Sequence, residues 1–360
     1  MKKINKILVA IFSLLMILTS CNDGIDPITS VNPGIDKSAP VVNIKYPLEG
    51  TKIKVREDVV SIKIDLEVTD DIEIEAIKVV LDNEEIATLN NFKDYRRVLK
   101  EVIYDHLETG EHELKVIAID LEQKETIEVV NFEKEAAYVP LYPNEILYMP
   151  FDGDYTELIS ITSATKVGSP NFAGESVVGT NAYVGAQDAY LTFPTKDLSL
   201  GTELSATFWY KVNPNPDRAG ILVIGPPDTD NPDAMNNRKS GFRFFRENAD
   251  GKQRVKLNVG NGTADAWVDG GAAADIDPTN DQWEHIAFTI SATEAVVYIN
   301  GNVVKRETIT GVDWTGCDIL SIMSGAPRFS EWGHKSDSSF LDDLRLYNKA
   351  LSEAEVQETM

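Results

Sequence analysis

Strict alternation of apolar and polar side chains is the feature that most restricts the fold of this chain. In residues 61–69, "SIKIDLEVT", Ile62, Ile64 and Leu66 alternate with charged residues. A period of two places the apolar side chains on one face of a β-strand and the charged ones on the other. The pattern returns at short spacing along most of the chain, between Gly, Asn and Asp turn residues. The sequence therefore predicts an all-β protein.

The alternating segments fall into two groups, which predict two domains. Those within residues 41–133 are short and closely spaced, as in a small antiparallel sandwich. Residues 134–145, "KEAAYVPLYPNE", read as a linker. Strands resume over residues 146–360, where many turns rich in Gly, Asn and Asp predict a larger jelly-roll sandwich.

Two local motifs predict particular structures in the second group. Asn300-Gly301 lies between alternating segments, as expected for a two-residue hairpin turn in which both residues have positive φ. Ser352 and Glu355 have the spacing of a capping box, which predicts a helix close to the end of the sequence.

The start of the sequence has the pattern of an export signal. Three lysines precede an apolar run, residues 7–18, that is too short to span a bilayer comfortably. The run leads into "LTSC", which resembles a bacterial lipobox and implies cleavage before Cys21 and lipidation of that residue. The alternative is an ordinary secretory signal that happens to contain a cysteine. We interpret residues 1–20 as a lipoprotein signal peptide and residues 21–40, rich in Pro, Gly, Asp and Ser, as a flexible tether.

The charge of the chain excludes one class of partner. The formal net charge is -24, and the acids are spread along the sequence. Such a surface repels nucleic acid and offers no basic patch for phosphates. We therefore expect no nucleic-acid partner.

Both groups of strands resemble known families. Residues 41–133, with "VTDDIEIEAIKVVLDNEEIATL", resemble bacterial immunoglobulin-like modules, which mostly act as spacers. Residues 146–360, with "LYMPFDGD", "LSATFWYKV", "DQWEHIAFTI" and "SSFLDDLRLYNKALSEAEV", resemble the laminin-G-like or concanavalin A-like jelly roll. The whole layout resembles the surface lipoproteins of Bacteroidetes polysaccharide-uptake systems. This resemblance implies a protein anchored by lipid in the outer membrane, at the cell surface. It also implies binding of a polysaccharide or oligosaccharide beside an outer-membrane glycan importer.

Catalytic motifs are missing from the second group of strands. Glycosidases of this shape often place two glutamates around an aspartate on one strand. Neither Glu-x-Asp-x-x-Glu nor Glu-x-Asp-x-Glu occurs in this group of strands. The sequence also lacks a nucleophile elbow, a phosphate loop and a zinc-protease motif. We therefore predict a non-catalytic protein. A glycosidase of the concanavalin A-like class, and an adhesion or structural module that binds another protein, remain as alternatives.

Tryptophans are the candidate sugar-binding residues, because the C–H faces of a pyranose stack on flat π-surfaces. Trp209 and Trp283 lie where the resembled family has core residues. Trp267, Trp314 and Trp332 lie in polar, Gly-rich surroundings, which favours exposed positions that contact a ligand. The alternative is that these three cover the edges of the sandwich.

Two adjacent acids, Asp342 and Asp343, interrupt the last predicted strand, "FLDDLRLY". Alternation places Asp342 on the side of Leu344, and therefore inward if that leucine faces the core. In the resembled family, the first acid of this motif often helps to hold calcium together with the opening strand, which here offers Asp152 and Asp154. The resemblance implies a structural Ca²⁺ site of Asp342 with either of these, and Asp343 as a further candidate. The alternative is that Asp342 accepts backbone amides or pairs with a basic side chain.

A second acidic segment, "PPDTDNPDAMNN", contains Asp228, Asp230 and Asp233. It resembles the start of an EF-hand loop, but the sixth and twelfth positions hold Asp233 and Lys239 instead of Gly and Glu. We therefore interpret it as a solvated loop.

Overall fold

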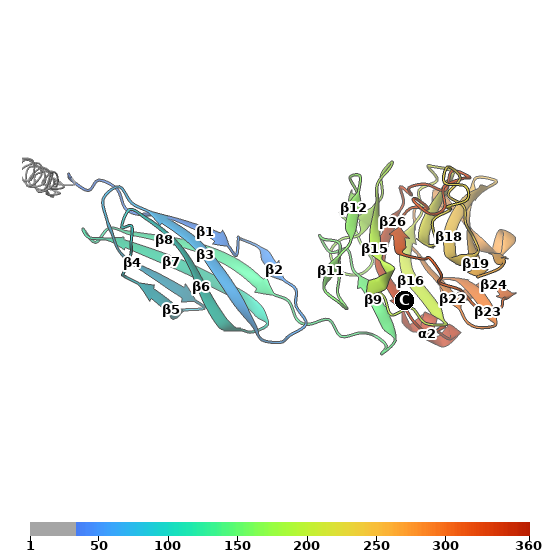
Figure 1. Ribbon diagram of the computed structural model, residues 1–360, viewed down its shortest axis with the longest axis horizontal. Coiled ribbons are helices and arrows are strands. Elements are labelled where there is room, and N and C mark those ends of the chain that lie inside the picture. Colours follow the sequence, from blue (N-terminus) through green and yellow to red (C-terminus); the bar gives the residue numbers. More distant parts are fainter. Residues whose placement is uncertain (1–33) are drawn as a thin grey trace, which may run out of the picture. The chain divides into compact units, whose positions relative to one another are not determined.

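The computed structural model describes residues 34–360 and is almost entirely β (Figure 1). The signal peptide, Cys21 and most of the tether lie outside the described residues. The described chain divides into two compact units, one of residues 34–53 and 59–134, the other of residues 54–58 and 135–360. No helix in this part of the chain is long and apolar enough to cross a membrane.

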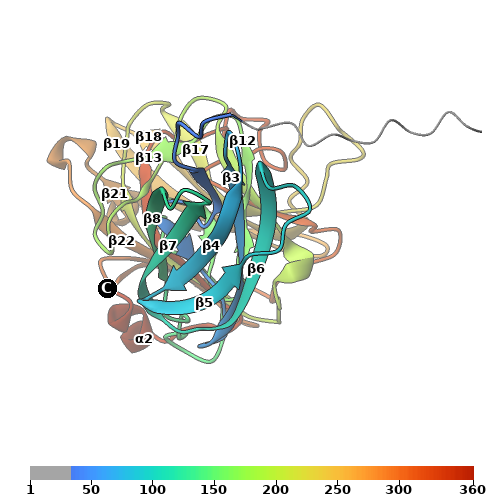
Figure 2. The ribbon, with the colours of Figure 1, turned by 90° about the vertical axis from the view of Figure 1, so that its left-hand side faces the viewer.

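The N-terminal unit is a sandwich of two sheets, seen end-on in Figure 2. One sheet has the order β1 (Val41–Tyr46), β3 (Val60–Thr69), β6 (Arg97–Leu107). The other has the order β2 (Thr51–Ile53), β8 (Glu125–Lys134), β7 (Gly110–Asp120), β4 (Ile74–Leu81), β5 (Glu84–Leu89). Ile62, Ile64 and Leu66 of β3 are buried in one core, as the alternation predicted. The likeness of this sandwich to immunoglobulin-like modules stays a prediction.

The C-terminal unit is a larger sandwich of two eight-stranded sheets. The first, here called the β18 sheet, has the order β12 (Thr165–Val167), β15 (Tyr190–Pro194), β25 (Ile319–Ile322), β17 (Arg218–Ile224), β18 (Ser240–Ala249), β19 (Lys252–Asn261), β20 (Asp265–Asp269), with β21 (Asp275–Ile276) also paired to β19. The second, here called the β16 sheet, has the order β13 (Asn171–Phe172), β14 (Tyr183–Val184), β26 (Phe340–Tyr347), β16 (Leu204–Lys211), β22 (Glu284–Ile290), β23 (Glu294–Ile299), β24 (Asn302–Thr308), with β9 (Glu145–Met149) also paired to β26.

Short elements complete the larger unit. The pair β10 (Thr156–Glu157) and β11 (Thr162–Ser163) stands apart from both sheets. Three 3₁₀ turns cover Thr195–Asp197, Gly271–Ala274 and Pro278–Asn280, and one α-helix, α2 (Glu353–Glu358), lies near residue 360. Both local predictions are confirmed: Asn300 and Gly301 have φ of 51° and 70°, and Ser352 and Glu355 form a capping box at α2.

The core of the larger unit lies between its two sheets, where aromatic rings from both meet. Phe244 of the β18 sheet stacks on Phe288 of the β16 sheet, with ring centroids 5.0 Å apart. The outer face of the β16 sheet is covered by Val356 of α2 and by Leu351, which precedes the helix. The outer face of the β18 sheet carries Phe245, which packs against Phe329 of the loop that joins β25 to β26. That second outer face is where exposed aromatic side chains gather.

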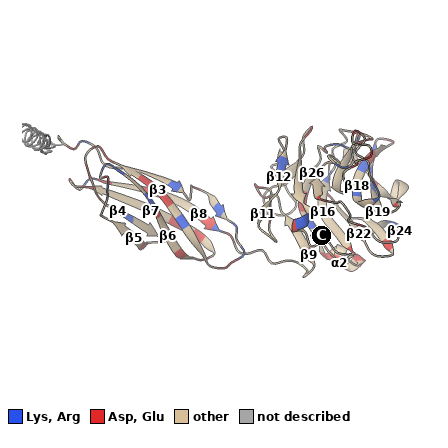
Figure 3. Cartoon of the chain, viewed as in Figure 1, with Lys and Arg blue, Asp and Glu red and all other residues tan. Residues whose placement is uncertain are grey.

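Acidic and basic residues are interspersed along the strands of both units (Figure 3). The acids outnumber the bases, in keeping with the formal net charge of -24.

Candidate functional site

Two tryptophans lie side by side on the outer face of the β18 sheet. Trp267 belongs to β20, and Trp332 belongs to the loop between β25 and β26. Their ring centroids are 6.3 Å apart, their planes are tilted by 34°, and each residue is 39% exposed. Both large rings are thus partly exposed to solvent, although they lie on a packed surface.

Buried aromatic side chains support both rings from beneath. Phe245 meets Trp267 edge-on, with centroids 6.0 Å apart, and Phe329 meets Trp332 in the same way at 5.9 Å. Both phenylalanines are buried, as is His334, which stacks on Phe329. Edge-to-face contacts of this kind contribute about 0.5–1.5 kcal/mol each. The indoles are therefore held in place before any ligand arrives.

Arg238 connects the two rings to a polar cleft. Its guanidinium carbon lies 5.4 Å from the Trp267 ring centroid and 5.0 Å from that of Trp332, within the range of cation–π attraction. Its Nε donates to Asp265 Oδ2 at 3.2 Å, and Asn258 Nδ2 donates to the same oxygen at 2.7 Å. We call Trp267, Trp332 and Arg238 the aromatic face.

The polar cleft beside Arg238 has a volume of about 290 Å³. It is lined by amide, carboxylate, hydroxyl and cationic groups: Asp228, Asp230, Asn231, Asn236, Asn237, Arg238, Lys239, Thr263 and Asp265, with Ala264. The acidic segment read as a solvated loop forms one wall of this cleft. Asp228 is buried there, and its two carboxylate oxygens are satisfied by the backbone N–H groups of Asn231 and Asn236.

The fully buried Arg243 holds this wall to the sheet. Its Nη1 donates to the carbonyl of Ser240 at 2.8 Å, and its Nη2 donates to the carbonyl of Asn237. Burial lowers the pKa of Arg243 to about 10, which leaves the side chain charged at neutral pH. The hydrogen bond to Asn237 fixes the residue immediately before Arg238.

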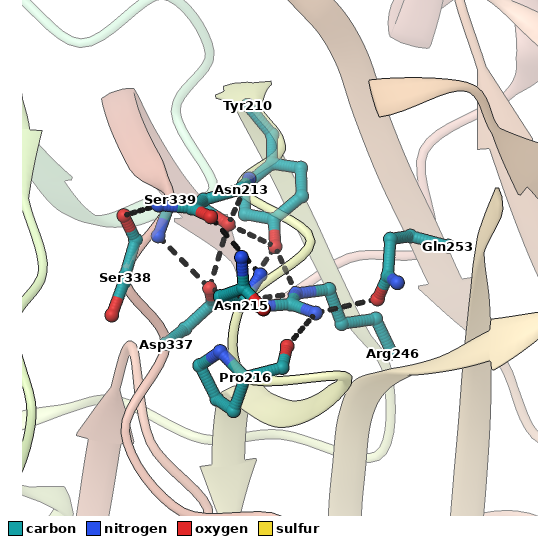
Figure 4. A network of polar contacts seen from close by, with 9 residues as sticks. All are labelled: Tyr210, Asn213, Asn215, Pro216, Arg246, Gln253, Asp337, Ser338 and Ser339. Atoms are coloured by element: carbon teal, nitrogen blue, oxygen red, sulfur yellow. Dashed lines mark hydrogen bonds and ion pairs between the residues drawn. The ribbon is translucent and has the colours of Figure 1, made fainter. Parts of the chain in front are cut away.

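A second buried arginine holds the loop that carries Trp332 (Figure 4). Arg246 and Asp337 are fully buried and pair through two hydrogen bonds, Nη2 to Oδ1 at 2.8 Å and Nε to Oδ2 at 3.0 Å. Tyr210 of the β16 sheet donates to Asp337 Oδ2 at 2.5 Å, and burial raises the pKa of its hydroxyl, which therefore keeps its proton. The network joins both sheets to the β25–β26 loop.

The structure separates the three predicted sugar-binding tryptophans. Trp267 and Trp332 come together, whereas Trp314 is half-buried, packs against the core, and donates from Nε1 to the carbonyl of Gly201 at 2.7 Å. Trp314 covers an edge of the sandwich, which is the alternative that the sequence left open. The expectation that Trp209 and Trp283 lie in the core is wrong, since both are half-buried and neither belongs to it. Trp209 stands on a residue of β16 that faces away from the core, and Trp283 precedes β22 and packs on Phe340.

A β-bulge changes the geometry expected for the paired acids. Asp343 has φ of 50°, and the register between β26 and β16 shifts where this extra residue is accommodated. Leu341 and Leu344 therefore both belong to the core, and Asp342 does not share a face with Leu344 as simple alternation predicted. The bulge places both aspartates on the face turned away from the core.

Asp342 and Asp152 bind the same loop, residues 177–181. Asp342 Oδ2 accepts the N–H groups of Val177 and Val178 at 2.7 and 2.9 Å. Asp152 Oδ1 accepts the N–H groups of Thr180 and Asn181. The pKa of Asp342 is raised to about 6, chiefly by burial.

The other two predicted metal ligands are paired with cations. Asp154 accepts a hydrogen bond from Lys54 at 2.7 Å, and Asp343 forms a two-point ion pair with Arg345 at 3.0 Å. Within residues 34–360, no group of three or more His, Cys, Asp or Glu side chains is arranged to hold a metal ion.

Sequence reasoning missed Arg238, Asn236 and Asp265. The available signal was the same Asp- and Asn-rich segment, which runs directly into "NNRKSGFRFF". A basic residue such as Arg238, between a polar loop and a buried strand, is expected to lie at the surface beside that loop. Nothing in the sequence links it to Trp267 or Trp332.

These features define the class of this domain: a two-sheet jelly roll with an exposed aromatic face. Residues 185–357 match the family model described as the concanavalin A-like lectin/glucanases superfamily, and the larger unit is a concanavalin A-like jelly roll. No curated protein sequence matches the chain.

Several solved structures are similar to parts of the chain. Domain 4 of an extracellular arabinanase from Geobacillus stearothermophilus, solved with arabinotriose, is 17% identical, with 60% of this chain and 98% of that chain covered and a TM-score of 0.45. The binding domain of Paraclostridial mosquitocidal protein 1 is 16% identical, with 60% and 51% covered and a TM-score of 0.43. A fibronectin(III)-like module structure of Clostridium thermocellum CbhA is 13% identical, with 28% and 100% covered and a TM-score of 0.23. Identities this low say nothing about the ligand of this chain.

Proposed function

We propose that this protein is a non-catalytic binding protein that holds a polysaccharide or oligosaccharide on the aromatic face of its jelly roll. The observation that carries the proposal is the pair of exposed, supported indoles, Trp267 and Trp332, beside a polar cleft. Indole rings stack on the C–H faces of sugars, and convergent polar groups can bond to sugar hydroxyls. The lack of a glycosidase acid cluster in the sequence supports a binding role.

Affinity electrophoresis against a panel of soluble polysaccharides tests the proposal. The wild type should be retarded by at least one polymer. Trp267→Ala and Trp332→Ala should each weaken the free energy of binding to that polymer by about 1–3 kcal/mol, the scale of one aromatic side chain stacked on one nucleic-acid base. Trp283→Ala is the matched control, since that half-buried ring packs on Phe340 instead. Full retention of both variants would remove the aromatic face from the binding site. Release of reducing sugar from the retained polymer would favour the glycosidase alternative.

We also propose that lipid on Cys21 anchors the protein in the outer membrane, at the cell surface, where it presents glycan to an outer-membrane importer. The support is the order of basic residues, apolar run and cysteine in the sequence.

Calcium remains a proposal, and two of the four predicted ligands fit it. Asp342 Oδ1 is buried and has no hydrogen-bond partner within the described residues, and Asp152 approaches the same loop. Asp154 and Asp343 are already paired with cations. We therefore propose Asp342 and Asp152 as the carboxylate ligands. Ca²⁺ takes six to eight oxygens, so backbone carbonyls and water would supply the others.

A further inference from the structure

A buried amide oxygen on the wall of the polar cleft lacks a hydrogen-bond donor. Within the described residues nothing donates to Asn236 Oδ1, which lies on the cleft wall. Asn258 Oδ1 also lacks a donor there, but Asn258 is fully buried behind Asp265 and does not line the cleft. A carboxylate fixes the orientation of each amide, since Asn236 Nδ2 donates to Glu331 and Asn258 Nδ2 donates to Asp265. Carboxylates only accept hydrogen bonds, so neither amide can turn round. A buried acceptor without a donor is unfavourable, and the cleft therefore favours a ligand that brings donors.

Arg238 supplies donors to the same cleft. Among the described residues its guanidinium donates only through Nε, to Asp265, and its central carbon lies near both indole rings, so the terminal nitrogens keep their donor capacity. The site thus offers acceptors and donors within reach of one stacking surface.

The charge around the cleft is unfavourable for an anion. Three carboxylates line it, those of Asp228, Asp230 and Asp265, against the two cations of Arg238 and Lys239. Arg238 is already paired with Asp265. The chain as a whole carries a formal net charge of -24, which repels a polyanion before it reaches the site.

We infer that the ligand is a neutral, hydroxyl-rich glycan and that this site rejects glycans bearing uronate or sulfate groups. The inference rests on the proposed function and adds the chemical class of its ligand. A hydroxyl both donates and accepts, so it satisfies Asn236 Oδ1 and also receives a hydrogen bond from Arg238. A carboxylate or sulfate group at that position brings acceptors only and leaves the amide oxygen unpaired, and it adds negative charge beside Asp228 and Asp230.

The test compares polymers that differ in charge on one backbone. The probes are methyl-esterified and de-esterified homogalacturonan, hydroxyethylcellulose and carboxymethylcellulose, together with neutral arabinan, galactan, xylan and mannan. We expect retention of the wild type by at least one neutral polymer, and retention by every acidic polymer to be weaker than this by about tenfold or more.

The outcomes separate this inference from the proposed function. An acidic polymer that retains the protein as strongly as its neutral counterpart overturns the inference and leaves glycan binding standing. No retention on any polymer contradicts the proposed function itself.

One variant tests whether the charge of the cleft causes the rejection. Asp230→Lys reverses an exposed charge on the cleft wall, and Asp197→Lys reverses an exposed charge outside it. We expect Asp230→Lys to raise retention on de-esterified homogalacturonan at least several-fold above that of Asp197→Lys. An equal effect of the two variants would show that net charge alone excludes anions, and would overturn the assignment to this site.

Discussion

His285 is a buried histidine whose protonation should affect the stability of the larger unit. It is 1% exposed, its ring lies 5.2 Å from that of Trp209, and no group of the described chain hydrogen-bonds to its Nδ1. Burial lowers its pKa from 6.5 to about 4. Well above pH 6.5 the folded and unfolded states both hold neutral histidine, so this residue then makes no pH-dependent contribution.

Stability should therefore fall as the pH drops from about 6.5 towards 4, because only the unfolded state takes up the proton in that window. The expected loss from this residue is on the order of 3 kcal/mol at the acid end. Urea denaturation over this pH range, for wild type and His285→Gln, isolates the effect as a difference in slope. Parallel curves for the two proteins would mean that His285 is protonated as easily in the fold as in the unfolded chain.

At the residue scale, the sequence identified side chains that could bind a sugar, but it did not predict which of them are exposed. Polar, Gly-rich surroundings were shared by Trp267, Trp314 and Trp332, yet Trp314 is half-buried against the core. Its indole N–H is satisfied by the carbonyl of Gly201, a residue far away in the sequence. Such long-range pairing follows from the path of the chain, which local composition does not encode.

At the element scale, the β25–β26 loop depends on the Arg246–Asp337 pair. Asp337→Ala would leave the Arg246 charge buried without a partner, so we expect a loss of about 3–5 kcal/mol in unfolding free energy. The double change Arg246→Met and Asp337→Leu should cost much less, because no charge then stays buried. Asp318→Ala is the control, since that exposed partner of Arg328 should contribute less than about 1 kcal/mol. Urea denaturation measures all three, and a small loss for Asp337→Ala would refute the role of the pair.

The calcium proposal is also decided at this scale, where the bulged strand β26 meets the loop of residues 177–181. If Asp342 and Asp152 hold Ca²⁺, the wild-type melting temperature should rise with calcium and fall with a chelator, because an ion that binds only the folded state stabilises it. Asp342→Asn should lose most of this shift. A wild-type melt that ignores calcium, or an undiminished shift in Asp342→Asn, would leave the backbone N–H groups of Val177 and Val178 as the partners of this carboxylate.

Strands and turns were predictable, but the bulge was not. Alternation in "SIKIDLEV" and the Asn300-Gly301 turn depend on neighbours in sequence, and the structure confirms both. The bulge at Asp343 depends on how β26 pairs with β16 and β9, which lie far away along the chain. Alternation therefore placed Asp342 on the wrong face.

At the scale of the whole molecule, the anchor decides where the protein works. Cys21 lies outside the described residues, and its lipidation is a prediction from sequence. We expect Cys21→Ala to move the protein from the membrane fraction to the soluble fraction after cell lysis. Cys317→Ala, which removes the other cysteine, should stay with the membranes. Sedimentation of Cys21→Ala with membranes would show that something other than this lipid holds the protein.

The aromatic face is likewise a product of the whole fold. Trp267 ends the β18 sheet at β20, and Trp332 reaches it only because the β25–β26 loop crosses the outer face. Arg238 arrives from a third segment, held by Arg243. The sequence predicted two of these three residues individually, Trp267 and Trp332. Their proximity depends on the order of the strands in the sheet.

The central claim is that glycan lies on Trp267 and Trp332, and the five indole N–H signals of this chain test it directly. In an NMR titration of ¹⁵N-tryptophan-labelled protein with an oligosaccharide of the retained polymer, single Trp→Phe variants assign each signal. We predict that the signals of Trp267 and Trp332 shift together with ligand, while those of Trp209, Trp283 and Trp314 stay in place. Saturable shifts confined to the other three, with Trp267 and Trp332 unmoved, would contradict the account.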